Sequence, residues 1–286
     1  KLEMISCFPR LVEMEQLYGS LFNALKARRR ENPGASPMGP GGWLTSFRGG
    51  VETLAETAAG LLGSALRLND SVTAAKPVTG GYVIQTAAGL NIRARRVFVA
   101  CPAWQAARII APLQDAAAWA LEAIPYAPIA VIALGYPRDR VGHPLDGFGF
   151  LVPRGESIRL LGCLWTSSIF PDQAPADHVL LRVMMGGAVD PAALDLTDTE
   201  LLNTVLRELT PLLRLEGMPL WTRFYRYPRG IPQYTLGHAA RLERLSEAER
   251  ASPGLYFCGN AYRGVGLNDC AVSAVTAVAR AMDRSD

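Results

Sequence analysis

The sequence predicts a mixed fold of α-helices and β-strands, and three observations support this fold class. Apolar residues recur at helical spacing between Val51 and Leu62, as on an amphipathic helix. Short runs rich in β-branched residues follow over residues 65–100, where Gly80-Gly81 marks a turn. A second block of such runs covers residues 129–185, and helical patterns resume after it. We therefore expect helices around two regions that are rich in strands.

Composition places the chain among globular proteins. Of its 286 residues, 49% are hydrophobic and 19% are charged, so the chain can bury a large core and is not a disordered tail. The formal net charge of +3 does not single out nucleic acid as a partner, and we expect none. The five cysteines include no C-x-x-C pair and the three histidines are far apart. Neither set predicts a metal site or a disulfide framework, which favours a cytoplasmic protein.

The start of the chain and its apolar runs bear on membrane contact. The longest uncharged apolar run, Ala123 to Pro137, is too short to span a membrane. The chain begins with Lys1 rather than Met and no leader-like apolar stretch follows, so we expect a piece of a longer protein. A helix is expected over Pro9–Arg30. Its basic end could touch acidic lipid head groups at the inner face of the cytoplasmic membrane, or could simply be a solvated helix end.

The remaining elements follow from turn signals and periodicity. A loop is expected over Asn32–Gly42, and a helix follows from about Gly49. The expected strands are Leu66–Leu68, Val72–Ala75, Tyr82–Thr86, Val97–Val99, Ile129–Leu134, Phe148–Val152, Ile158–Trp165, Val179–Met185, Trp221–Tyr227 and Leu255–Cys258. Further helices are expected after Cys101-Pro102, over Asp198–Leu213, over Leu236–Arg250 and from about Asp269.

The most informative stretch is the glycine-rich loop before the last helix. An apolar strand ends at Cys258, and Gly259, Gly264 and Gly266 follow before the helix that is expected from about Asp269. Glycines let the backbone approach a ligand closely, and a helix N-terminus offers free N–H groups with a partial positive charge. Together these features suit a phosphate or a ring that becomes anionic. A plain structural turn is the alternative.

Four stretches, taken together and in this order, resemble a known family. They read S-F-R-G-G-V-E-T-L at 46–54, G-F-G-F-L-V-P at 147–153, I-P-Q-Y-T-L-G-H at 231–238 and F-C-G-N-A-Y-R-G-V-G-L-N-D-C at 257–270. This series is similar to the motifs of the FAD-dependent protoporphyrinogen and coproporphyrinogen oxidases of haem synthesis. The resemblance covers essentially the whole chain.

The resemblance implies an α/β fold with an FAD-binding Rossmann-like domain of the glutathione-reductase and amine-oxidase type, and an inserted β-sheet substrate domain. The implied segments are the end of a helical, membrane-associating or substrate-binding region (1–44), an FAD-binding segment (45–112), the substrate-binding sheet (113–228) and a C-terminal FAD-binding segment (229–286). The family begins with a G-x-G-x-x-G clamp for the FAD pyrophosphate. No such run follows a strand near the start of this chain, so we expect an incomplete FAD domain. The family's anchor for the substrate's propionates is expected in the same missing part.

The resemblance also implies which residues bind FAD. The backbone of Val72 would hold the adenine, and Tyr227 would lie against the flavin where some relatives carry Trp. The residues expected at the ribityl chain and the flavin ring are Gly259, Asn260, Val265, Gly266, Leu267 and Asp269. Asp269 could instead be only the N-cap of the last helix or an acid/base group, and Arg48 could bind an FAD phosphate or belong to a turn. Cys258 and Cys270 are expected to be packed side chains rather than nucleophiles.

The implied substrate is a large, mostly apolar tetrapyrrole, for which an apolar pocket is expected. The matched strands suggest the substrate-binding residues Phe148, Gly149, Leu151, Leu161, Leu164 and Met184. Read without the resemblance, each is an ordinary residue of a sheet. No residue is expected to act as a catalytic acid, base or nucleophile, because placement and exclusion of water are the protein's main contributions.

The implied reaction removes six electrons from a porphyrinogen in three hydride transfers to flavin N5, with O2 reoxidising the flavin to give H2O2. Protoporphyrinogen IX and coproporphyrinogen III are both open as substrates. Two alternatives remain: another flavin oxidase of the amine oxidase or phytoene desaturase kind, and a non-enzymatic piece that binds a partner or a porphyrin without turnover. The oligomeric state is not readable from the sequence.

Overall fold

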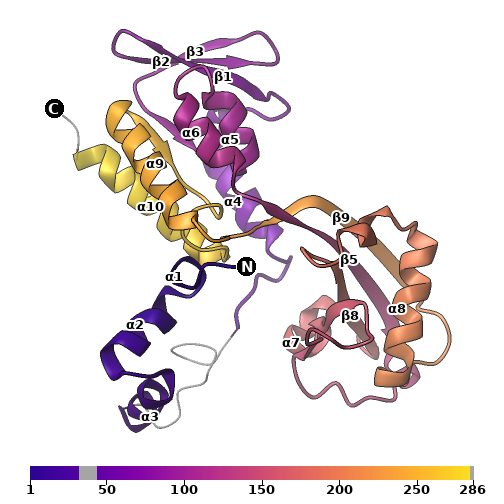
Figure 1. The fold of residues 1–286 in the computed structure, drawn as a ribbon. Helices are drawn as coiled ribbons and strands as arrows, with labels where there is room; N and C mark the ends of the chain where they lie inside the picture. The colour runs from indigo at the N-terminus through magenta and orange to yellow at the C-terminus, as the bar shows by residue number, and fades with distance from the viewer. Residues whose placement is uncertain (32–43, 284–286) are drawn as a thin grey trace. The chain divides into compact units, whose positions relative to one another are not determined.

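The computed structural model describes residues 1–31 and 44–283, and the chain divides into two compact units (Figure 1). Unit one consists of Lys1–Ala35, Arg67–Pro125 and Pro232–Asp286, and unit two consists of Ser36–Leu66 and Tyr126–Ile231. The loop expected over Asn32–Gly42 lies outside the described residues. The four segments implied by the resemblance stay a prediction.

Unit one contains two small sheets. Strands β1 (Val72–Val78), β2 (Gly81–Thr86) and β3 (Asn91–Ala94) form an antiparallel sheet in the order β1-β2-β3. Strands β4 (Val97–Val99) and β10 (Leu255–Phe257) pair in parallel, with Leu255 opposite Val97 and Phe257 opposite Val99. Because the two strands run in the same direction, the segments that follow them leave from the same edge of this sheet.

Several helices belong to unit one. They are α1 (Met4–Cys7), α2 (Pro9–Tyr18), α3 (Leu21–Glu31), α5 (Ala103–Ile110), α6 (Asp115–Glu122), α9 (His238–Ala251) and α10 (Leu267–Asp283). Helix α5 packs against β1 and α6, and α6 packs against α9. Ala277 and Ala281 of α10 are buried against Tyr256 and Cys258 of the β10 segment. Small side chains on this side of α10 therefore let the helix lie close to the strand.

The helix expected over Pro9–Arg30 is broken, and the single-helix prediction is wrong at this point. Gly19 adopts the left-handed conformation with φ of +74°, which ends α2. The Ser20 hydroxyl then accepts the backbone N–H of Asn23 at 3.1 Å, as a residue before a new helix does. Gly19 and Ser20 are the local sequence signals of this break, and the single-helix prediction did not use them.

Unit two is built on one five-stranded sheet with the strand order β6-β7-β8-β5-β9. The strands are β5 (Tyr126–Pro137), β6 (Gly149–Leu151), β7 (Leu160–Trp165), β8 (His178–Gly186) and β9 (Trp221–Pro232). The unit's helices are α4 (Glu52–Leu62), α7 (Thr166–Ile169) and α8 (Asp198–Leu213), with short 3-10 turns at Gly63–Ala65, Arg138–Arg140, Pro171–Gln173 and Pro191–Asp195.

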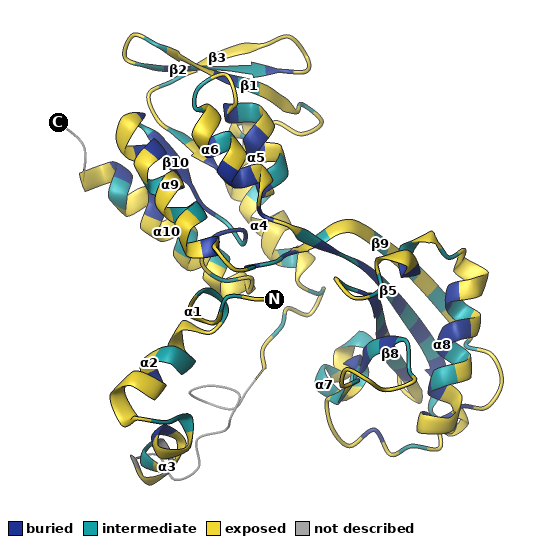
Figure 2. Cartoon of the chain, in the orientation of Figure 1, coloured by how far each residue is buried: buried dark blue, intermediate teal, exposed yellow. Residues whose placement is uncertain are grey.

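The core of unit two lies between the sheet and α8. Alternate residues of β5 and β8 are buried there together with Leu201, Val205 and Leu209 of α8 (Figure 2). Helix α8 begins with a capping box, in which the Thr197 hydroxyl accepts the Glu200 N–H and the Glu200 carboxylate accepts the Thr197 N–H. Hydrogen bonds from Thr197 lower the pKa of Glu200. The helix bounds agree with those expected from the sequence.

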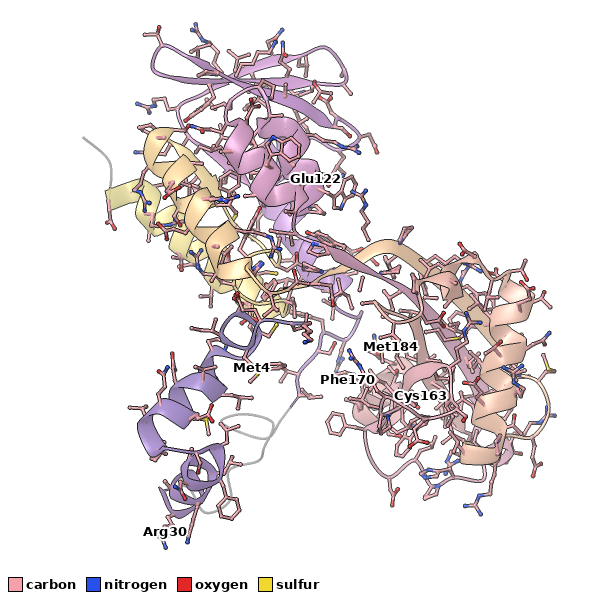
Figure 3. The ribbon with its side chains drawn as sticks, in the orientation of Figure 1. Met4, Arg30, Glu122, Cys163, Phe170 and Met184 are labelled. Carbon is pink, nitrogen blue, oxygen red and sulfur yellow. The ribbon has the colours of Figure 1, made fainter. Side chains whose placement is uncertain are left out.

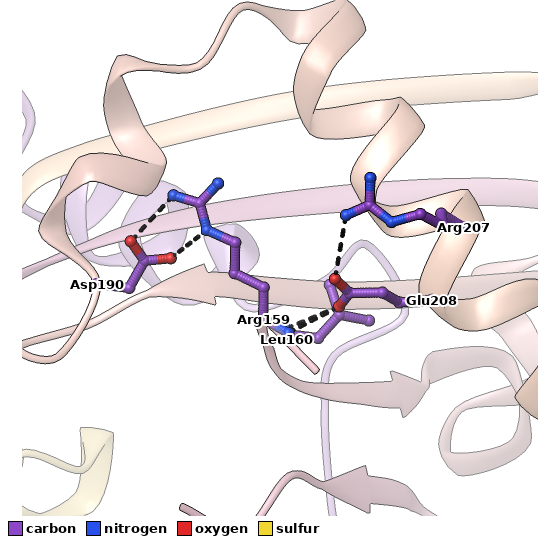
Figure 4. Close-up of polar contacts among 5 residues, drawn as sticks. All are labelled: Arg159, Leu160, Asp190, Arg207 and Glu208. Carbon is purple, nitrogen blue, oxygen red and sulfur yellow. Dashed lines mark hydrogen bonds and ion pairs between the residues drawn. The ribbon is translucent and has the colours of Figure 1, made fainter. Parts of the chain in front are cut away.

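Polar contacts hold the start of β7 against α8 (Figure 4). One oxygen of the Glu208 carboxylate accepts the backbone N–H groups of Arg159 and Leu160 at 2.9 and 3.1 Å. The Arg159 guanidinium makes a two-pronged ion pair with Asp190 at 2.6 and 3.0 Å, which raises the pKa of Arg159. These contacts fix the register between the helix and the sheet.

Several expected strands differ from those observed. Leu66–Leu68 is not a strand, and β3 and α6 were not expected. Strands β5 and β9 extend well beyond the apolar runs that predicted them, because pairing with a neighbouring strand also recruits prolines and polar residues at the strand ends. The last helix begins at Leu267, two residues before the expected start.

Candidate functional site

The glycine-rich loop leaves the carboxyl edge of the parallel pair β4 and β10. Ala100 follows β4, and Cys258 and Gly259 follow β10. Gly259 has a φ of +121°, and a Cβ at this position would lie 3.5 Å from the carbonyl oxygen of Ala100. A glycine is therefore favoured here by its backbone conformation, and it lets the two strand ends lie close together. Burial raises the pKa of the Cys258 thiol, which is consistent with a packed side chain.

Tyr234 holds the loop from the side. Its ring is buried, and its hydroxyl donates to the Asn260 carbonyl oxygen at 2.6 Å and accepts the Gly264 N–H at 2.8 Å. Burial raises the pKa of Tyr234 to about 12, so the hydroxyl stays protonated and can make both contacts. One side chain thus bridges two points of the loop.

His238 packs against Tyr234 next to the loop. The two rings stack with their centroids 4.1 Å apart, and Nε2 of the fully buried His238 lies 2.9 Å from the Tyr262 carbonyl oxygen. Burial lowers the pKa of His238, so the ring is neutral near pH 7 and its Nε2–H donates to that carbonyl. Both side chains come from the 231–238 motif, which the sequence analysis matched without assigning these roles. The sequence signal that could have indicated these roles was a tyrosine and a histidine in one matched motif, together with the glycine-rich loop.

Asp269 closes the other end of the loop. Its Oδ2 accepts the Gly266 N–H at 3.0 Å, and a Cβ on Gly264 would lie only 2.6 Å from the same oxygen. Gly264 also has a φ of +133°. Both this backbone angle and the nearby Asp269 carboxylate therefore require glycine at this position. Asp269 is the third residue of α10, not its N-cap, so that expectation is corrected. Its carboxylate still accepts a backbone N–H at the positive end of the helix.

Val265 and Leu267 are exposed apolar side chains next to these glycines. Asn260, whose carbonyl is bound by Tyr234, is half-buried. The predicted flavin contacts Gly259, Asn260, Val265, Gly266, Leu267 and Asp269 therefore belong to one continuous loop and helix start in unit one. The exposed side chains of the loop include the apolar Val265 and Leu267, and the exposed Asp269 carboxylate accepts the Gly266 N–H.

A cavity of about 460 Å³ lies beside the same strand edge in unit one. Val72 lines it from the antiparallel sheet, Ala100 and Cys101 line it from the end of β4, and Arg108 lines it from α5. Because the Ala100 carbonyl is also the group that Gly259 approaches, the cavity and the glycine-rich loop share this strand end. Its size is in the range of small-molecule sites. Burial raises the pKa of Cys101, so this residue lines the cavity as a thiol.

An ion pair between a buried glutamate and a partly exposed arginine anchors β10. Glu249 of α9 accepts the Phe257 N–H at 2.8 Å and pairs with Arg280 of α10. The Arg280 guanidinium also lies over the Tyr256 ring, 6.0 Å from its centroid. The sequence analysis missed this pair because Glu249 and Arg280 are 31 residues apart.

The predicted substrate residues lie in unit two. Register places Gly149 opposite Leu164, and Leu151 and Met184 each opposite Gly162, on the face turned away from α8. Met184 therefore lies on the side away from Cys163 of the neighbouring strand, which is buried in the core (Figure 3). Leu161 occupies the irregularity between the Leu160 and Gly162 pairs. Phe148 precedes β6, is exposed, and accepts the Trp165 N–H at its carbonyl.

Two further predicted FAD contacts, Tyr227 and Arg48, belong to unit two. Tyr227 lies on β9 of unit two and is exposed, whereas the other predicted flavin contacts belong to unit one. Arg48 is exposed in a turn in which the Gly50 N–H binds the Phe47 carbonyl at 2.9 Å, so the turn that was its alternative is formed. Within residues 1–31 and 44–283, no group of histidine, cysteine and acidic side chains could hold a metal ion. No helix in those ranges is long and apolar enough to cross a membrane.

Comparisons with known proteins agree with this architecture. The model of the family described as flavin containing amine oxidoreductase matches residues 1–282. The coproporphyrinogen III oxidase of Bacillus subtilis is 30% identical over 99% of this chain and 60% of its own length. The chloroplastic protoporphyrinogen oxidase of Nicotiana tabacum is 33% identical over 94% of this chain and 53% of its own length. The chain thus spans little more than half the length of these relatives.

Solved structures give the same result. A protein of Exiguobacterium that carries the provisional name protoporphyrinogen oxidase superposes with a TM-score of 0.81 and 27% identity, over 99% of this chain and 60% of that one. Putrescine oxidase superposes with a TM-score of 0.63 and 21% identity over 83% of this chain and 53% of that one, which shows a shared fold. The α/β fold of the flavin amine oxidase type, expected from the resemblance, is confirmed.

Proposed function

Because the chain belongs to the flavin containing amine oxidoreductase family, we propose that it acts in the FAD-dependent oxidation of a porphyrinogen to a porphyrin in haem biosynthesis. The observation that carries the proposal is the glycine-rich loop at residues 258–269. Tyr234 and Asp269 fix the backbone of this loop by hydrogen bonds. The names of relatives at about 30% identity support the porphyrinogen as substrate.

The residues of unit one fit a flavin cofactor. The adenine would lie in the cavity at Val72, and the loop would take the ribityl chain and the ring beside Gly259 and Gly266. A side chain on either glycine would fill space next to the strand end or the Asp269 carboxylate. Bound FAD would supply a two-electron hydride acceptor. Helix α10 presents its N-terminus at this loop, where its dipole favours negative charge on a bound group.

The residues of unit two fit a flat apolar substrate. The sheet face that carries Leu151, Leu164 and Met184 is mostly apolar, and its five strands contain no aspartate or glutamate. Its role would be to position the macrocycle and to exclude water. The proposed reaction removes six electrons in three two-electron steps, with O2 as the final acceptor and H2O2 as its product. Contact with a membrane surface is proposed only as peripheral.

The test begins with the cofactor. Purified protein is incubated with FAD, separated by gel filtration and examined for a retained flavin absorption band. Gly264→Ala is expected to lower flavin retention at least about tenfold, because its Cβ would overlap the Asp269 carboxylate at a backbone angle that disfavours Ala. Gly60→Ala is the matched control, because a Cβ on Gly60 in α4 meets no atom within 4 Å.

The second step is turnover. The flavin-loaded protein is given protoporphyrinogen IX or coproporphyrinogen III in the presence of O2, and porphyrin fluorescence and H2O2 are followed. The expected result is porphyrin formation from at least one substrate with stoichiometric H2O2. A protein that keeps its flavin but converts neither porphyrinogen would overturn the proposed function.

A further inference from the structure

The sheet of unit two has one face packed on α8 and one open face. We define the open face by the alternate side chains that point away from the core: Val131, Ala133, Leu164, Arg182, Met184, Arg223 and Tyr225. On β8 the fully buried Leu181 and Val183 flank Arg182, so Arg182 points the other way. On β9 Phe224 packs against the core, so its exposed neighbours Arg223 and Tyr225 belong to the open face.

The charge on this face is one-sided. None of the five strands contains an aspartate or a glutamate. Among the described residues, neither Arg182 nor Arg223 has an ion pair or a hydrogen bond from its guanidinium. Arg226, on the covered side of the same strand β9, is bound by Asp198 at 2.5 Å and by the Leu196 carbonyl at 2.8 Å. The open face therefore combines an apolar platform with two cations that lack partners within the part of the chain that the structure describes.

Strand register sets the spacing of the two cations. Arg182 on β8 lies opposite Leu164 on β7 and opposite Ala133 on β5. On the far side of β5, Trp221 lies against Gly135, and the strands run antiparallel, so Arg223 lies alongside Ala133. Two strand spacings separate the arginine backbones, about 10 Å. The small Ala133 between them leaves room for a flat ligand to approach the sheet.

We propose that Arg182 and Arg223 bind peripheral carboxylates of the porphyrinogen, and that the open face thereby selects coproporphyrinogen III over protoporphyrinogen IX. This inference rests on the proposed function. A guanidinium binds a carboxylate with two parallel hydrogen bonds. A vinyl group packed against the guanidinium would remove water from it without accepting a hydrogen bond in exchange. Coproporphyrinogen III carries four propionates, and protoporphyrinogen IX carries two propionates and two vinyl groups.

Counting the anchors favours the substrate with four carboxylates. Family resemblance implies one propionate anchor in another part of the protein, and Arg182 and Arg223 add two more. That makes three anchors, one more than protoporphyrinogen IX has carboxylates. With protoporphyrinogen IX bound, two carboxylates would meet three anchors, so one anchor would be left without a carboxylate, which is unfavourable.

The test measures binding of the stable porphyrins, which needs neither flavin nor turnover. Coproporphyrin III and protoporphyrin IX are titrated into the full chain, and porphyrin fluorescence reports the dissociation constants. Arg182→Gln and Arg223→Gln are each expected to weaken coproporphyrin III binding about tenfold, as expected for the loss of a charged hydrogen bond, and to change protoporphyrin IX binding much less. Arg182→Lys should recover part of the loss.

The control is Arg207→Gln, on α8 at the covered side of the sheet. The Arg207 side chain is exposed, and among the described residues it pairs only with its neighbour Glu208, at 3.4 Å. It is expected to change neither affinity. Unchanged coproporphyrin III binding in both open-face variants, equal losses for the two porphyrins, or no binding of either porphyrin by the unmodified chain would each overturn the inference. A chain that binds coproporphyrin III through these arginines but converts neither porphyrinogen would keep the inference and overturn only the proposed function.

Discussion

The loop of unit one and the open face of unit two are built by opposite means. In the loop, Tyr234 and Asp269 bind main-chain atoms at fixed points, so the backbone conformation of the loop is held in place. On the open face, strand alternation alone presents side chains such as Met184, and the guanidinium groups of the two arginines there make no hydrogen bonds within the described residues. The first site depends on hydrogen bonds and glycines, and the second depends on sheet register. Substitutions should therefore affect the two sites separately.

The largest effect is expected from the ion pair behind the loop. Glu249→Leu leaves Arg280 without its carboxylate and the Phe257 N–H without its acceptor. We expect the free energy of unfolding to fall by about 2 kcal/mol, because the buried Phe257 N–H loses its acceptor and the partly exposed Arg280 loses its partner. Urea unfolding followed by circular dichroism measures it. Glu243→Ala, which breaks the exposed pair with Arg250, should change stability by less than about 0.5 kcal/mol, and equal effects of the two variants would contradict the prediction.

A smaller effect is expected from the bridge across the loop. Tyr234→Phe removes the hydroxyl that contacts the Asn260 carbonyl and the Gly264 N–H. We expect a loss of about 1–2 kcal/mol in unfolding free energy and weaker flavin retention, with porphyrin binding unchanged. Tyr18→Phe is the control, because Tyr18 is exposed on α2 and lies in neither site. Loss of porphyrin binding in Tyr234→Phe would show that the two sites are not independent.

The converse experiment concerns the open face. Met184→Ala removes a half-buried side chain, so we expect a cost of only about 1 kcal/mol in stability, below the range for fully buried methionines. Porphyrin affinity should fall several-fold while the flavin absorption band after gel filtration stays at the level of the unmodified chain. A variant that lost flavin and kept porphyrin affinity would reverse the assignment of the two surfaces.

The smallest effect is a pH dependence of unit one through His238. Burial lowers the pKa of His238 in the folded state, so its contribution to stability is present above the unfolded value near 6.5 and is lost as pH falls below it. Thermal unfolding from pH 8 to pH 5 should show a midpoint that falls toward acid. His238→Gln, whose amide can still donate to the Tyr262 carbonyl, should flatten this slope, and an unchanged slope would rule out His238 as its source.

Through Tyr234, the stability of the same region also depends on pH in the alkaline range. Its pKa is raised to about 12 by burial, so the stability it contributes is complete below the unfolded value near 10 and is lost as pH rises toward 12. Burial also raises the pKa of Tyr82 and Tyr136. Tyrosinate absorption followed during an alkaline titration should therefore show several tyrosines that ionise late, with one step near pH 12 from Tyr234. That late step should be absent from Tyr234→Phe.

Local patterns determined much of this protein. The glycine-rich loop, the bounds of α8 at Asp198 and Leu213 and the strand at Val97–Val99 could be predicted from the sequence, because turn chemistry, capping and apolar periodicity act over a few neighbouring residues. The order of the four motifs along the chain also indicated the family. Such signals are contained within single elements.

Only the tertiary structure decided which residues meet. Tyr234 reaches Asn260 and Gly264, Glu249 reaches Arg280, and the register of β5, β8 and β9 places Arg182 and Arg223 on one face. These contacts join residues that are distant in the chain, and no local period contains them. Strand pairing and burial are set by the whole fold, because each strand's neighbours decide which of its faces is covered.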